Sequence, residues 1–267
     1  MHLLLITVVA FLAAAINSVA GGGTFLTFPT LVGVGSLSEK VANMTSTIGL
    51  WPGSAASIYA GRKDIASVPR TMAFTYAMIS LVGGTLGAVL LRYYTSAKTF
   101  SYVIPWLLAF ATLVFAFSKP IARWAGRKHG HRTVGWTVFV GFVQLLVALY
   151  GGYFGAGIGV LMLAGLSFAG LDDIHQMNGL KVMLATIING TAAVIFVISS
   201  IIAPTGADRV DWPIALCMAL AGAVGGFLGM VAARRIKPDQ LRLVILAIGL
   251  VLTVVYFVKN YGLLGWR

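Results

Sequence analysis

Apolar runs of about twenty residues follow one another along this chain, and they restrict its possible folds more than any other feature. A run of that length is what an α-helix needs to cross the hydrocarbon core of a bilayer, whereas barrel strands show alternation over about ten residues. The composition agrees, because only 10% of the 267 residues are charged, against about 25% in an ordinary soluble domain. The sequence therefore predicts an all-α integral membrane protein.

Charged residues, glycines and prolines divide the chain into ten segments, five in each half. The segments are 3–20, 24–35, 41–60, 71–91 and 100–118, then 133–150, 157–169, 175–200, 212–232 and 240–258. The second segment of each half has about 12 residues, which as a helix would extend roughly 18 Å into a core about 30 Å thick. We therefore expect each half to contain four full spans and one half-helix or re-entrant stub.

Short matches between the halves indicate a duplication. "GGTLG" at 83–87 recurs as "GGFLG" at 225–229, and the break before each short segment is followed at a common spacing by Asn43 and by Asn178. The two glycine clusters lie in the middle of long segments, where small residues let helices pack closely. We expect a first membrane repeat at 1–118, a basic linker at 119–132 and a second membrane repeat at 133–267.

The basic residues predict how the chain lies in the membrane. If the linker is cytoplasmic, twelve of the nineteen Lys and Arg residues fall on that side and six on the other, as the positive-inside rule requires. The basic loop residues that give the net charge of +12 then serve to orient the helices in the membrane. Because the charge is explained in this way, we expect no nucleic-acid partner. An odd number of segments per half makes the halves antiparallel, so the sequence predicts inverted-topology repeats with broken helices at their interface. We expect a multi-pass protein of the cell inner (plasma) membrane, either monomer or homodimer.

The two breaks before the short segments predict a binding site. Non-helical backbone at membrane depth is tolerated only inside the protein or along an aqueous cavity. A glycine-flanked helix start offers free N–H groups and partial positive charge to an anion. The residues concerned are Gly21, Gly22, Gly23 and Thr24 at the first break, and Gly155 and Gly157 at the second.

Lys181 is the charged residue that the sequence places deepest in the membrane. A helix that begins near Asp172 or Asp173 would carry it about 13 Å along the axis, and an intramembrane lysine is a functional-site hypothesis by default. All seven acidic residues fall at segment ends or in loops, so the usual carboxylate ligands for cations are missing from the spans. The deep charge is positive, and it favours an anion as substrate.

The motifs resemble those of a known family. "INSVAGGG", followed by Pro29 and then "ANMTST", and in the second half "YFGAGIG" followed by "MNGLKVMLATIINGTAA", are similar to the TauE/SafE sulfite-exporter family of anion permeases. The resemblance covers essentially the whole chain and implies transport of sulfite, sulfonates, sulfoacetate or other small organic anions. It implies a central site made from Asn17, Ser18, the Gly21–Gly23 turn, Asn43, Thr45, Ser46, Asn178 and Lys181. The second break lacks the Asn-Ser pair of the first, so the two half-sites are chemically unequal.

The sequence is compatible with three functions to different degrees. An alternating-access permease for small anions explains the paired breaks and the lysine. An anion channel would use the same features, and counterflow would separate the two. An intramembrane enzyme would need a nucleophile, acid–base pair or metal cluster at depth, and the four histidines lie near the chain ends, at a segment end or in the linker. We expect no cofactor and no metal.

Overall fold

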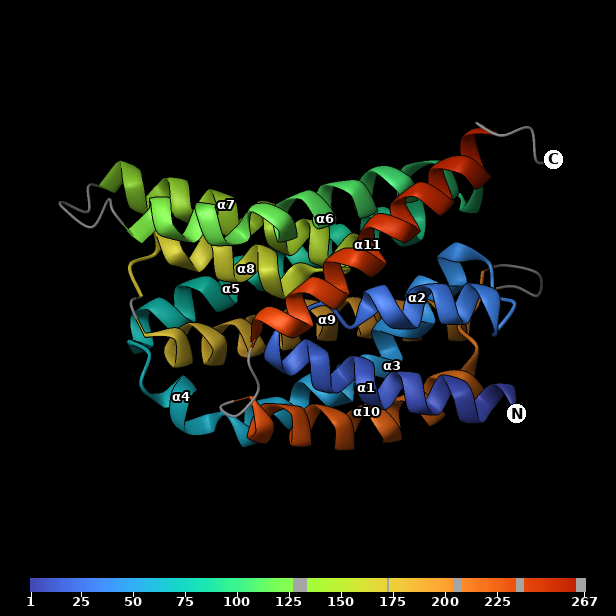
Figure 1. The fold of residues 1–267 in the computed structure, drawn as a ribbon, viewed down its shortest axis with the longest axis horizontal. Helices are drawn as coiled ribbons and strands as arrows, with labels where there is room; N and C mark the ends of the chain where they lie inside the picture. The colour runs from blue at the N-terminus through green and yellow to red at the C-terminus, as the bar shows by residue number, and fades with distance from the viewer. Residues whose placement is uncertain (127–133, 172, 204–207, 234–237, 263–267) are drawn as a thin grey trace.

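The structure, a computed structural model, describes residues 1–126, 134–171, 173–203, 208–233 and 238–262, and within these ranges it is helical and without strands (Figure 1). The helices are α1 (His2–Val19), α2 (Thr24–Gly33), α3 (Glu39–Ala60), α4 (Arg62–Ala66), α5 (Arg70–Val89), a π-helix η1 (Leu90–Tyr94), α6 (Ala97–Gly126), α7 (Val134–Tyr153), α8 (Ile158–Phe168), α9 (Ile174–Ile202), α10 (Trp212–Ala232) and α11 (Pro238–Tyr261). All ten predicted segments are present. The short helix α4 was not predicted.

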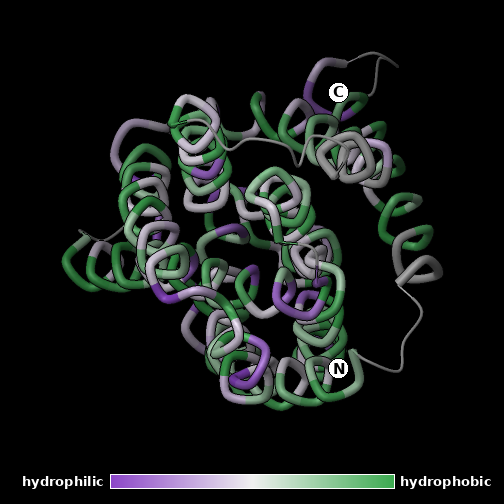
Figure 2. Tube along the Cα trace, turned by 90° about the vertical axis from the view of Figure 1, so that its left-hand side faces the viewer, coloured by the Kyte–Doolittle hydropathy of each residue, from purple (hydrophilic) through white to green (hydrophobic). Residues whose placement is uncertain are grey.

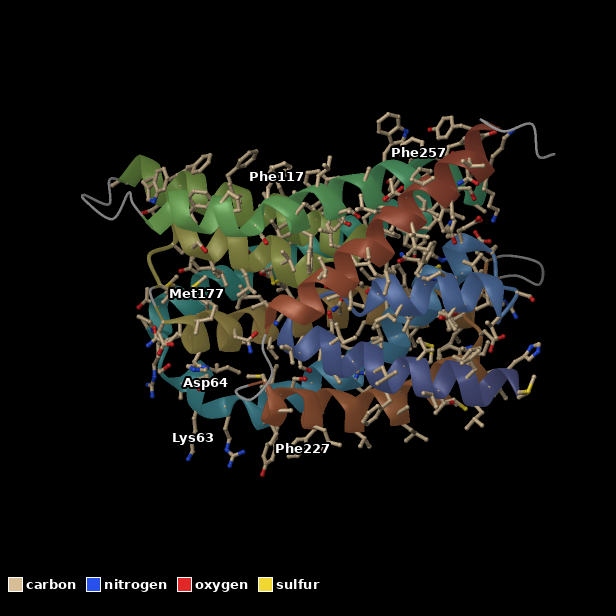
Figure 3. The ribbon with its side chains drawn as sticks, viewed as in Figure 1. Lys63, Asp64, Phe117, Met177, Phe227 and Phe257 are labelled. Carbon is tan, nitrogen blue, oxygen red and sulfur yellow. The ribbon has the colours of Figure 1, made fainter. Side chains whose placement is uncertain are left out.

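Seven helices are long and apolar enough to cross a membrane, which confirms the multi-pass prediction. They are α1, α5 with η1, α6, α7, α9, α10 and α11. Seen end-on, the outer helices of the bundle carry mostly hydrophobic residues (Figure 2). Phe117 and Phe227 point outward from opposite faces (Figure 3), as expected for surfaces that contact lipid.

Helix α3 differs from the predicted full spans. Its 22 residues would extend about 33 Å, but the polar run that begins at Asn43 makes it less apolar than the seven spanning helices. Asn43, Thr45 and Ser46 are each at most 1% exposed. The polar side chains of this run contact other parts of the protein and not lipid, so they are tolerated at membrane depth.

The two short helices have the predicted lengths. Helix α2 has 10 residues and α8 has 11, or about 15 and 17 Å of helix. Neither can cross a core of about 30 Å upright. Each is separated from the long helix before it by a glycine-containing break, at residues 20–23 and 154–157.

Side-chain caps fix where the long interior helices begin. The Ser38 hydroxyl accepts a hydrogen bond from the Val41 amide at the start of α3, and the Asp173 carboxylate accepts one from the His175 amide at the start of α9. Such caps satisfy amide groups that have no partner within the helix. Asp172, the alternative start predicted for α9, lies outside the described residues.

Glycines bring the helices into close contact. A Cβ on Gly225 would lie 2.2 Å from the Phe11 carbonyl oxygen of α1, and one on Gly83 would lie 2.6 Å from the Ala148 Cβ of α7. The "GGTLG" and "GGFLG" clusters are therefore helix contacts, as predicted.

The start of α3 is held by two ion pairs. Glu39 Oε1 lies 2.8 Å from Lys259 Nζ of α11. Lys40 Nζ lies 3.2 Å from Asp208 Oδ2 and donates to the Thr95 carbonyl at 2.7 Å. These neighbouring residues join α3 to the helices around it at the end of the molecule where Met1 and the end of α11 also lie (Figure 1).

The opposite end of the molecule collects the ends of α6 and α3, the starts of α7 and α9, and α4 (Figure 1). Arg62, Lys63 and Arg70, one of the basic groups that the sequence assigns to the cytoplasmic side, belong to α4 and to the start of α5 at this end. The predicted linker at 119–132 begins inside α6, which continues to Gly126, and residues 127–132 lie outside the described chain.

Candidate functional site at the two helix breaks

The two breaks touch each other through glycine. Gly21 lies in the first break and has a positive φ of 75°, a conformation that glycine adopts without strain. A Cβ on Gly21 would lie 2.4 Å from the Cα of Gly159, in the first turn of α8, and a Cβ on Gly159 would lie 2.5 Å from the Cα of Gly21. The backbones meet at a distance that no other residue type allows, although 138 positions separate them in the sequence.

Lys181 lies beside this contact, with its Cδ 3.3 Å from the position of a Cβ on Gly159. It is the eighth residue of α9, and its side chain is 1% exposed. Its Nζ donates to the carbonyl oxygens of Asn17 at 3.3 Å and Ser18 at 3.1 Å. These carbonyls belong to the last turn of α1, where intrahelical partners end and the helix dipole is negative. Lys181 thus caps the broken end of α1 from another helix.

No carboxylate lies opposite Lys181 among the described residues. An ammonium group has three N–H donors, and two of them are used by the carbonyls of α1. A buried charge without an opposite charge is destabilising by several kcal/mol. The Lys181 ammonium group therefore lacks a negatively charged partner, and its third N–H is available to donate to one.

A small cavity adjoins the lysine. It is lined by Asn17, Ser18, Ser54, Ser57, Ile158, Gly159, Lys181, Val182 and Ala185. The space open to the centre of a water molecule is about 10 Å³, which is enough for about one water. The cavity therefore has no room for a molecular anion in this conformation.

Several donors of the lining residues have no protein partner in the described chain. The Asn17 side chain and the Ser54 hydroxyl line it and make no hydrogen bond. The Gly159 amide lies in the first turn of α8, where the residue four positions earlier is not helical, and it too is unpaired. Together with the third N–H of Lys181, these groups can donate to the oxygens of one small anion.

The hydroxyls of Ser18 and Ser57 are engaged elsewhere. They lie 2.7 Å apart, and both are 2.9 Å from the carbonyl oxygen of Gly226 on α10. This group joins α1, α3 and α10. Because each hydroxyl has one proton and uses it within the group, neither serine has a donor left for the cavity. Ser18, predicted as a binding residue, contributes its carbonyl to Lys181 and its hydroxyl to packing.

Asn43 and Lys181 each contact the end of a broken helix in the other half, although at the spacing of 135 positions Asn43 corresponds to Asn178 and Lys181 to Ser46. Asn43 Nδ2 of α3 donates to the carbonyl of Tyr153, the last residue of α7, at 3.1 Å. Lys181 of α9 donates to the carbonyl of Ser18, near the end of α1. Ser18 and Tyr153 are 135 positions apart, as are Asn43 and Asn178. Each broken helix is therefore capped by a donor from the other half.

The other predicted residues do not line the cavity. Asn178 Nδ2 contacts Met230 Sδ at 3.5 Å, and its Oδ1 is buried without a partner. The Thr45 hydroxyl accepts from the Asp211 amide and the Ser46 hydroxyl pairs with that of Thr27. The remaining ones, namely Gly22, Gly23, Thr24, Gly155 and Gly157, form the breaks and the first residue of α2.

Sequence reasoning missed Ser54, Ser57 and Gly159. Serines in membrane helices usually bond to their own backbone, so their presence alone carried no signal. Their spacing of three residues, which places both on one face of α3, was the available indication. Gly159 ends the "YFGAGIG" motif, but its contact with Gly21 depends on how distant segments pack.

Comparison with known proteins gives one family and several relatives. The family profile described as "Sulfite exporter TauE/SafE" matches residues 6–256. One relative is a "Probable membrane transporter protein ORF9" of Sinorhizobium sp, 28% identical over 61% of this chain and 60% of that protein. A second is a "Probable membrane transporter protein" of Haemophilus influenzae, 27% identical over 66% of each chain. A third is the "Probable membrane transporter protein YfcA" of Escherichia coli, 29% identical over 67% of this chain and 64% of that protein.

Each of these alignments spans less than two thirds of the relative's own length. No solved structure matches the chain.

Proposed function

Because the chain belongs to the sulfite exporter TauE/SafE family, which is a family of transporters and not of enzymes, we propose that it carries small anions across the membrane by alternating access. The substrates that fit best are sulfur-containing or organic anions such as sulfite, sulfonates or sulfoacetate. The printed names of the relatives support membrane transport and specify no substrate.

One observation carries the choice of an anion. Lys181 is buried, its ammonium group has carbonyl partners and no carboxylate partner in the described chain, and unpaired donors surround it. A small oxyanion would supply the missing negative charge and accept hydrogen bonds from these donors.

The size of the cavity supports alternating access. About 10 Å³ admits a water molecule and not an anion of several heavy atoms, so the elements around the site have to separate before a substrate enters. The breaks meet through two glycines and a capping lysine, and these contacts can be released without unfolding a helix.

We propose further that the halves are inverted-topology repeats. Support comes from the capping residues Ser38 and Asp173, which begin α3 and α9 at the same spacing of 135 positions as Ser18 and Tyr153. The reciprocal caps on α1 and α7 are the pattern expected where two repeats meet at a midplane site.

The end of the molecule that carries α4 is the cytoplasmic end in this proposal, and the membrane is the plasma membrane. Export of a monoanion from a negative cytoplasm then gains about 2.3 kcal/mol per 100 mV. The membrane potential alone is sufficient to drive export of an anion, whereas import would need coupling to another gradient.

Anion binding to purified protein tests this function. Thermal unfolding is measured with sulfite, thiosulfate, sulfoacetate, taurine and sulfate, for the wild type and for Lys181→Met, which keeps the length of the side chain and removes its charge. We expect at least one anion to raise the Tm of the wild type and to leave that of Lys181→Met unchanged.

Lys40→Met serves as the control, because Lys40 is also a buried lysine (4% exposed) but is paired with Asp208 at the far end of α3. It should retain the anion-dependent rise in Tm. An undiminished rise in Lys181→Met would refute the role of Lys181, and a wild type that no anion stabilises would refute the substrate class.

A further inference from the structure

We propose that the site at Lys181 selects anions that carry a single negative charge. The inference rests on the proposed function and narrows its substrate class by charge, which neither the family nor the relatives specify.

The ionisable side chains that line the cavity set its formal charge. Among the described residues that line it, Lys181 is the one with an ionisable side chain, and the others are serines, an asparagine, a glycine and apolar residues. None of the acidic side chains in the described chain lies in this lining. Asp64 comes near it through backbone contact with Gly179 of α9, but it interacts elsewhere. The formal charge of the described site is therefore one positive.

Arg92 and Lys40 lie too far along the helices to add a second charge. Arg92 bonds to Ser199, which is 18 residues beyond Lys181 on α9, or about 27 Å of helix. Lys40 precedes Ser54 by 14 residues on α3, or about 21 Å. Arg62 and Lys63 of α4 are exposed, and Lys63 points away from the bundle (Figure 3).

The helix ends do not change this balance. The carbonyl end of α1 contributes partial negative charge beside Lys181, and the amide end of α8 contributes partial positive charge at Gly159. Each helix end is worth about half a charge, so the two contributions largely cancel. The hydroxyl of Ser54 and the amide of Asn17 donate hydrogen bonds but carry no charge.

A monoanion is therefore neutralised by Lys181, whereas a dianion leaves one negative charge uncompensated in a closed site. Buried ions are tolerated when they are paired, and an unpaired one carries a large desolvation penalty. We expect the penalty to weaken binding of a dianion about tenfold or more relative to a monoanion of the same shape.

The test compares probes that differ in charge and little in size. Methanesulfonate and sulfate are both tetrahedral at sulfur, with one and two negative charges. Sulfoacetate and its carboxamide share a carbon skeleton and differ by one charge. Dissociation constants for the four probes are measured by calorimetry on the detergent-purified full chain at pH 7.

The wild type should bind the singly charged member of each pair about tenfold more tightly or better. Lys181→Arg, which keeps the charge, should retain the preference, and Lys181→Met should lose it together with most of the affinity. Lys40→Met should behave as the wild type does, because its lysine is outside the site.

Equal or tighter binding of the doubly charged member of either pair by the wild type would overturn the inference and leave the proposed function intact. Failure of all four probes to bind, together with failure of the sulfite and thiosulfate panel, would overturn the proposed function as well. A preference that persists in Lys181→Met would also overturn the inference, because the selecting charge would then lie elsewhere.

Discussion

Ser54 and Ser57 are neighbours on one face of α3 and have different tasks. Both line the cavity. The Ser57 hydroxyl belongs to the group that joins α1, α3 and α10 through the Gly226 carbonyl, whereas the Ser54 hydroxyl has no hydrogen-bond partner in the described chain. The structure thus separates a serine that holds helices together from one whose hydroxyl has no partner among the described residues.

Two alanine variants test this difference. Ser54→Ala should leave the Tm of the ligand-free protein unchanged and weaken anion binding about tenfold, because a hydrogen bond to a charged group is worth about 1.5–3 kcal/mol. Ser57→Ala should lower the ligand-free Tm by a few degrees, since it removes a buried bond worth about 0.5–1 kcal/mol. Thermal unfolding with and without sulfite measures both effects. Equal losses of ligand-free Tm in the two variants would contradict the assignment.

At the scale of elements, the contact between the two breaks carries the most specific geometry. Gly159 lies in α8 and faces the backbone of Gly21, so an added methyl group would meet rigid backbone at 2.5 Å before it reaches the Lys181 side chain at 3.3 Å. Gly33, the last residue of α2, has no atom within 4 Å of an added Cβ. The two glycines therefore form a matched pair on the two short helices.

Gly159→Ala should lower the Tm by on the order of 5 °C, because overpacking typically destabilises by about 1–3 kcal/mol. It should also reduce transport, since it forces the two breaks apart. Gly33→Ala should differ from the wild type by less than about 0.5 kcal/mol. Thermal unfolding and uptake into proteoliposomes give both readouts. If Gly159→Ala unfolded and transported as Gly33→Ala does, the close contact of the breaks would be wrong.

Most of the elements could be predicted from the sequence, because hydrophobic length and glycine punctuation are local signals. Helix α3 is informative in this respect. Its predicted range, 41–60, is close to Glu39–Ala60, but the burial of its polar residues Asn43, Thr45 and Ser46 is a tertiary property that the ten-segment pattern does not contain.

The site was predicted only in part, because some of its features are local in the sequence and others depend on tertiary packing. Lys181 and the breaks were recognised because a charge at depth and consecutive glycines are unusual in an apolar chain. The contact of Gly21 with Gly159, and the capping of Ser18 by Lys181, depend on packing between segments more than 130 positions apart. The roles of individual serines follow from that packing, and no spacing rule gives them.

At the scale of the whole molecule, the two halves of the chain contact each other at both helix breaks. Each half has a helix that stops inside the bundle, and each stop is capped by a polar side chain from the other half, by Asn43 on α7 and by Lys181 on α1. Separation of the halves would uncover both helix ends together. An anion that replaces the Ser18 carbonyl as the partner of Lys181 would couple substrate binding to this movement, which is the behaviour required of a carrier.

Counterflow of labelled sulfite in proteoliposomes tests the central claim most directly, because it requires a substrate site that is exposed alternately to the two sides. Vesicles loaded with unlabelled sulfite and containing the wild type should accumulate external label transiently above equilibrium. Vesicles with Lys181→Met should show no accumulation above protein-free vesicles. Label entry without an overshoot in the wild type would identify a channel, and an overshoot of equal size in Lys181→Met would contradict the assignment of Lys181 as the substrate's charge partner.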